Sequence, residues 1–122
     1  MISRAIPLLT ALLLTAGSAL AAPAKPPKIE PPVTVESLLA NAHAAASRGE
    51  TELALRLAQA AIVADPARPG SYVALGDIYA GTGQPDFARN FYDAALGIDP
   101  SEPSALKALS ALEQSPTVNA AR

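Results

Sequence analysis

The sequence predicts an all-α fold of antiparallel helix hairpins stacked as repeats, an architecture of the α-solenoid type. Half of the 122 residues are apolar and many of these are alanine, while five are aromatic and none is tryptophan. Such a composition favours thin, closely packed helices over a sheet of bulky side chains. The signals that end helices recur 34 residues apart, Gly49-Glu50 with Gly83-Gln84 and Ala64-Asp65-Pro66 with Ile98-Asp99-Pro100. Aligning residues 35–68 with residues 69–102 gives nine identities.

The first repeat, residues 35–68, predicts two helices joined by a tight turn. Thr34 is placed to cap a helix from Val35 to about Ser47, which Gly49 then breaks. A second helix is expected from about Thr51 to Ala64, because Pro66 forbids its continuation. Two helices so joined form a hairpin.

The second repeat, residues 69–102, follows the same pattern. It predicts helices from Gly70 to about Ala80 and from Pro85 to about Gly97, with Gly81 and Gly83 in the turn.

One further helix is expected from Glu102 to about Gln114, capped by Ser101. Its predicted apolar stripe comprises Ala105, Leu106, Ala108, Leu109 and Leu112, and its outward residues are Lys107, Ser110 and Glu113. Because the sequence predicts no second helix after it, we expect the segment 103–115 to be a capping helix and residues 116–122 to be a flexible tail.

The amino-terminal segment, residues 1–21, has the pattern of a secretory signal peptide, with Arg4, an apolar stretch and then small residues. We expect cleavage between Ala21 and Ala22, giving a periplasmic or secreted protein. The alternative is an uncleaved anchor, although the apolar stretch is shorter than the ~20 residues of a spanning helix. Residues 22–34 contain five prolines and predict an extended linker, either a spacer or a proline-directed docking peptide.

The second repeat resembles the tetratricopeptide repeat (TPR) family, whose motif of aromatic, Leu-Gly, Tyr, Ala, aromatic, Ala and Pro residues it matches at the family's spacing. The matching residues are Tyr72, Leu75, Gly76, Tyr79, Ala88, Tyr92, Ala95 and Pro100. The first repeat is a degenerate version, in which Asn41 stands where the family buries leucine. We expect Gly76 and Ala88 to let paired helices approach closely, and all five aromatic side chains to lie in the core between units.

The sequence predicts no enzyme, metal site or cofactor. His43 is the only histidine and there is no cysteine, so neither a tetrahedral zinc site nor an identifiable catalytic triad can be assembled. Without Arg4, 8 basic residues stand against 11 acidic ones, a net charge of −3 that is unlike a nucleic-acid-binding protein.

Binding of a protein or peptide partner is therefore the predicted function. The resemblance implies that the first helix of each repeat lines a concave binding face, on which we expect a shallow groove formed by Leu39, His43, Val73, Asp77 and Lys107. The protein is then an adaptor or scaffold of the bacterial cell envelope. The alternatives are that these are solvated surface residues, or that the chain is a structural subunit that self-associates through the alanine-rich outer face of its first helices.

Overall fold

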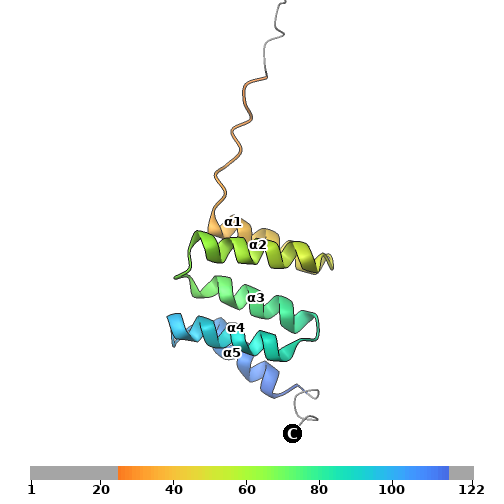
Figure 1. The fold of residues 1–122 in the computed structure, drawn as a ribbon, viewed down its shortest axis with the longest axis vertical. Coiled ribbons are helices and arrows are strands. Elements are labelled where there is room, and N and C mark those ends of the chain that lie inside the picture. Colours follow the sequence, from red (N-terminus) through yellow and green to blue (C-terminus); the bar gives the residue numbers. More distant parts are fainter. Residues whose placement is uncertain (1–24, 116–122) are drawn as a thin grey trace, which may run out of the picture. The chain divides into compact units, whose positions relative to one another are not determined.

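A computed structural model describes residues 25–115, which contain five helices and no strand: α1 (Val35–Ser47), α2 (Thr51–Ala64), α3 (Pro69–Gly81), α4 (Pro85–Ile98) and α5 (Pro103–Glu113). The helices α1 and α2 form one antiparallel hairpin, α3 and α4 form a second, and α5 packs against the second (Figure 1). The prediction of an all-α fold of stacked helix hairpins is confirmed, and the observed helix bounds lie within one residue of the predicted ones.

The chain divides into two units, residues 1–30 and residues 31–122. Of the first unit the structure describes residues 25–30, which are exposed and lie outside any helix or strand. The predicted signal peptide, its cleavage point between Ala21 and Ala22, and the tail at residues 116–122 lie outside the described residues. Within the described range, no helix is both long and apolar enough to cross a membrane.

The start of α1 is fixed by Thr34, as predicted. The N–H of Ser37 donates to Thr34 Oγ1 at 3.1 Å, and the N–H of Thr34 donates to Ser37 Oγ at 3.0 Å, which together form a capping box. The prediction that Ser101 caps the last helix is wrong, because the Ser101 N–H and hydroxyl both donate to Asp99 Oδ1. Glu102 caps α5 instead, its carboxylate accepting from the N–H of Ser104 at 3.2 Å.

The turn inside each hairpin is built on a glycine in the left-handed region. Gly49 has φ of 76° and Gly83 has φ of 74°, a conformation that residues with a Cβ adopt at a cost. In both turns the following N–H returns to the helix, from Glu50 to the Ala45 carbonyl and from Gln84 to the Tyr79 carbonyl, each at 2.9 Å. The 34-residue spacing in the sequence is therefore a repeat of backbone geometry as well.

The two Asp-Pro junctions also repeat each other. Asp65 Oδ1 accepts from the N–H of Ala67 at 3.1 Å, and Asp99 Oδ1 accepts from the N–H of Ser101 at 3.0 Å. These side chains satisfy backbone donors just beyond α2 and α4, where the following proline prevents another helical turn.

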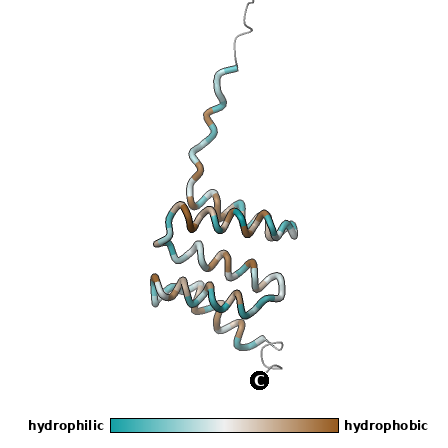
Figure 2. Tube along the Cα trace, in the orientation of Figure 1, coloured by the Kyte–Doolittle hydropathy of each residue, from teal (hydrophilic) through white to brown (hydrophobic). Residues whose placement is uncertain are grey.

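The core consists mostly of alanine. Fully buried alanines occur at equivalent positions of the two hairpins, Ala54 with Ala88 and Ala61 with Ala95. Hydrophobic residues occur in all five described helices, as the hydropathy colouring shows (Figure 2), and in α3 the buried residues lie on more than one face. Small side chains at these positions let neighbouring helices pack closely.

The closest packing of α3 against α4 occurs at Gly76. A Cβ at this position would lie 2.4 Å from Tyr92 Cε1 and 2.6 Å from Tyr92 Cδ1, distances that no side chain tolerates. Gly76 thus makes room for the Tyr92 ring, which is only 2% exposed, and not directly for Ala88.

Two predictions of burial are wrong. Phe87 is 54% exposed, although its ring stacks on Tyr79 with centroids 5.3 Å apart. Leu106 of the predicted apolar stripe on the last helix is 49% exposed. Periodicity alone therefore overstated the width of the buried stripe on α4 and α5.

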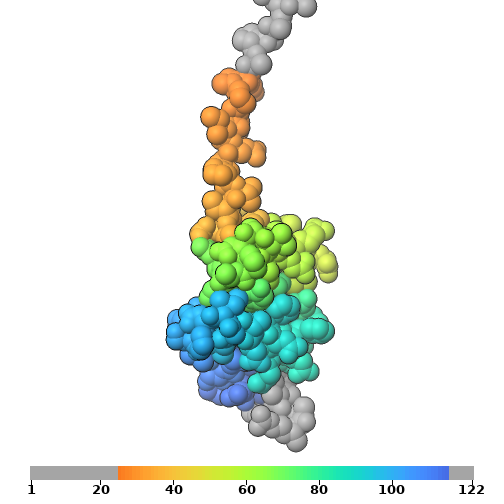
Figure 3. Space-filling model, turned by 60° about the vertical axis from the view of Figure 1, so that its left-hand side comes forward, coloured from red at the N-terminus to blue at the C-terminus, as the bar shows by residue number. Residues whose placement is uncertain are grey.

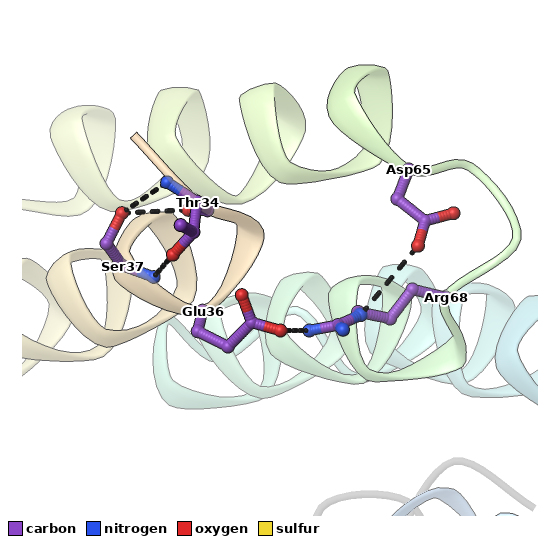
Figure 4. A network of polar contacts seen from close by, with 5 residues as sticks. All are labelled: Thr34, Glu36, Ser37, Asp65 and Arg68. Atoms are coloured by element: carbon purple, nitrogen blue, oxygen red, sulfur yellow. Dashed lines mark hydrogen bonds and ion pairs between the residues drawn. The ribbon is translucent and has the colours of Figure 1, made fainter. Parts of the chain in front are cut away.

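The first hairpin is joined to the second by apolar packing and by Arg68. The helix α2 packs on α3, so the two hairpins lie against each other in the space-filling view (Figure 3). Arg68, at the start of α3, donates to the Glu36 carboxylate of α1 and lies 3.9 Å from the Asp65 carboxylate (Figure 4). The Glu36 backbone N–H first, and Arg68 second, hold the pKa of the Glu36 carboxyl below its usual value of 4.5.

Candidate partner-binding groove

A hollow between α3 and α5, here called the α3–α5 groove, is also lined by Tyr92 of α4. It has a volume of about 480 Å³. Its residues are Val73, Asp77, Ala80, Tyr92, Ser104, Lys107, Ala108, Ala111, Leu112 and Ser115. Most of these side chains are small or apolar, and those that carry charge are Asp77 and Lys107. A hollow of this size, with mostly apolar walls and a few polar groups, is typical of a binding site.

The Asp77 carboxylate is held in place by Tyr92. The Tyr92 hydroxyl donates to Asp77 Oδ1 at 2.7 Å, joining a buried ring of α4 to an exposed carboxylate of α3. Burial, followed by the hydrogen bond and the charge of Asp77, raises the pKa of the Tyr92 hydroxyl. Tyr92 therefore stays a neutral donor at physiological pH, and one carboxylate oxygen of Asp77 has a fixed direction.

The groove carries charges of both signs that do not pair with each other. The ion pairs among residues 25–115 join Arg48 to Glu50, Arg89 to Glu113, and Arg68 to both Glu36 and Asp65. Asp77 and Lys107 take part in none of them. Each is exposed, so each can be neutralised by a group from outside the described chain.

The structure brings together three of the five residues predicted for the binding groove. Val73, Asp77 and Lys107 line the α3–α5 groove, with the Val73 side chain 8% exposed. His43 and Leu39 occupy positions in the first repeat equivalent to Asp77 and Val73 in the second. This equivalence does not bring them into the same groove.

Leu39 and His43 do not line this groove. Leu39 packs against the alanine core of the first hairpin, and His43 is exposed on α1, where its carbonyl accepts from the Ser47 hydroxyl at 2.9 Å. A smaller hollow of about 160 Å³, which neither Leu39 nor His43 lines, is formed by Asp77 together with Ala46, Gly49, Thr51, Ile78, Gly81 and Thr82. Asp77 thus lies at the border of two hollows and faces both.

The sequence did not assign Tyr92 to the site. Its motif position and size placed it in the core, which is where the ring lies, but the hydroxyl reaches the groove. The sequence did offer one indication: the hydroxyl of a buried tyrosine needs a polar partner, and Asp77 lies on the helix that pairs with that of Tyr92. Tyr72 follows the same rule, since its hydroxyl donates to the Pro66 carbonyl at 3.2 Å.

The arrangement is suited to binding. Among residues 25–115, no three His, Asp or Glu side chains lie close enough together to hold a metal ion. The groove offers a fixed acceptor, an ammonium group and apolar walls, which can orient a polypeptide segment by charge and shape.

Comparison with known proteins returned no match, either to a protein-family model or to a curated protein sequence.

Proposed function

We propose that this protein is a protein–protein interaction module of the TPR type, exported to the cell envelope, which binds a partner segment in the α3–α5 groove. The observation that carries the proposal is the groove itself. It is a hollow of about 480 Å³ with largely apolar walls, and its one carboxylate and one ammonium group form no ion pair within the described residues. The repeated hairpin geometry and the match to the TPR motif at residues 69–102 support it.

The shape of the site favours a partner segment over a small molecule. The groove is lined by residues of α3 and α5, and three of them, Ala80, Ala108 and Ala111, have small side chains that leave space for a partner's side chains. Repeat architectures use such surfaces between successive units for recognition.

Photo-cross-linking in the native envelope tests the proposal. A benzophenone amino acid at Ala111, an exposed groove residue, is expected to form an adduct with a specific protein. The matched control is the same amino acid at Ala60, an exposed alanine of α2 outside the groove. Identical adducts from both positions, or none from Ala111, would contradict the proposal.

Self-association is the second candidate, because Ile98 and Leu106 near the carboxyl-terminal end of the stack are 39% and 49% exposed. Light scattering of the purified protein separates the two functions. A stable dimer that is abolished by Leu106→Glu, while cross-linking from Ala111 gives only the chain itself, would favour the structural role.

Export can be tested by the intact mass of the protein recovered from the envelope or medium. We expect a chain that begins at Ala22. A mass that includes residues 1–21 would show that the segment is retained.

A further inference from the structure

Asp77 differs from most exposed carboxylates because one of its oxygens is already fixed. The Tyr92 hydroxyl donates a hydrogen bond to Asp77 Oδ1. The Tyr92 ring is only 2% exposed, and Gly76 provides the space that it occupies. A carboxylate so held loses little further freedom when it pairs with a partner, which makes it an effective recognition group.

Lys107 lies on the opposite wall of the same groove and forms no ion pair within the described residues. Because Asp77 and Lys107 do not pair with each other, the groove presents a negative wall on α3 and a positive wall on α5. The same walls also carry small side chains, Ala80 on α3 and Ala108 and Ala111 on α5. A partner with one sign of charge would satisfy one wall and be repelled by the other.

We propose that the α3–α5 groove selects a partner segment that places a lysine or arginine against Asp77 and an aspartate or glutamate against Lys107, with small apolar residues between them. This inference rests on the proposed binding function and specifies the chemistry of the partner. The two walls would also fix the direction of the bound segment, because a reversed segment puts like charges together.

A random dodecapeptide library displayed on phage, panned on the immobilised full chain, tests the inference. With the natural sequence, we expect the recovered peptides to be enriched in one basic and one acidic position at a constant spacing. Asp77→Asn keeps an acceptor for the Tyr92 hydroxyl but removes the charge, so the basic preference should disappear and a selected peptide should bind about fivefold more weakly.

Charge reversal gives the stricter version of this test. Asp77→Lys should change the preference at the first position from basic to acidic, and Lys107→Glu should change the second position from acidic to basic. Asp93→Asn is the matched control, an exposed aspartate of α4 outside the groove, and should leave both preferences unchanged. Circular dichroism of each variant checks that the helices are intact.

The possible failures can be told apart by blocking the groove with Ala111→Trp, for which Ala60→Trp is the control. Peptides whose capture is lost with Ala111→Trp, but whose sequences show no basic preference or the same preference in Asp77→Asn, would overturn the inference and leave groove binding intact. Peptides captured equally by the Ala111→Trp variant, or no captured peptides at all, would overturn the inference and count against the proposed function as well.

Discussion

The two hairpins have similar backbone conformations but carry different side chains at equivalent positions. Where the second hairpin has Gly76 and Tyr92, the first has Ala42 and Ala58, and all four residues are buried. The alanine pair of the first hairpin is buried like the glycine and the ring of the second, but it carries no hydroxyl. The comparison shows that the 34-residue period determines helix geometry, while the choice of small or aromatic residue decides which hairpin can hold a polar group at its surface.

The helix starts differ in a parallel way. Thr34 caps α1 and bonds with Ser37, whereas the residue 34 positions later, Arg68, gives α3 no side-chain cap. Ser71, the equivalent of Ser37, is fully buried and its hydroxyl has no hydrogen-bond partner. The serine at this position therefore stabilises the first hairpin and destabilises the second.

Replacing Tyr92 by alanine should have the largest effect on stability. It introduces the residue found at the equivalent position of the first hairpin, but Gly76 then faces an empty space. We expect the free energy of unfolding to fall by about 3–5 kcal/mol, the usual cost of deleting a buried aromatic ring. Urea unfolding followed by circular dichroism measures it. A loss below about 1 kcal/mol would show that the ring contributes little to packing.

Gly76→Ala tests the same contact from the opposite side. The new Cβ would lie 2.4 Å from Tyr92 Cε1, so we expect a loss of about 1–3 kcal/mol from overpacking, despite alanine's higher helix propensity. Thermal unfolding measures it. Gly97→Ala is the matched control, because a Cβ at this α4 glycine meets nothing within 4 Å, and it should stabilise the helix.

A double variant then tests the coupling between the two residues. In the Tyr92→Ala background the obstruction is gone, and Gly76→Ala should be neutral or stabilising. Equal losses in both backgrounds would show that the Tyr92 ring is not the obstacle.

The two serines should respond to alanine in opposite directions. Ser71→Ala removes a buried hydroxyl without a partner and should stabilise the protein by about 1 kcal/mol, while Ser37→Ala breaks the capping box and should cost about 1 kcal/mol. Ala105, which occupies the equivalent place in α5, is fully buried and needs no partner. Equal changes in melting temperature for the two variants would contradict this reading.

The smallest expected effect is the acid sensitivity that Glu36 contributes at the start of α1, where its own backbone N–H and then Arg68 favour the charged carboxylate. The pKa of Glu36 is lower in the folded protein than its usual value of 4.5, so its contribution is present above that pH and is lost as the pH falls below it. Glu36→Gln should therefore flatten the loss of stability with falling pH in this range. Glu52→Gln, at an exposed first-turn residue of α2, is the control. If it flattens the pH dependence of stability equally, the ion pair with Arg68 does not contribute to the effect.

The helices were predictable because their ends are determined locally. Thr34, Gly49, Gly83 and the prolines act on their own backbone, and the sequence shows them directly. The cap of α5 was missed because two neighbouring groups compete, and Asp99 takes both donors of Ser101. The exposure of Phe87 and Leu106, and the position of the Tyr92 hydroxyl, depend on which helices lie nearby, so they required the tertiary arrangement.

The repeated Asp-Pro junction has a consequence for how such a chain can grow. Asp65 and Asp99 form the same hydrogen bond, and the helices that follow begin at Pro69 and Pro103. A duplicate of residues 69–102 inserted ahead of Pro103 would therefore meet the same junction at both of its ends. We expect the chain to accept extra copies without a new linker, each lengthening the stack by one hairpin.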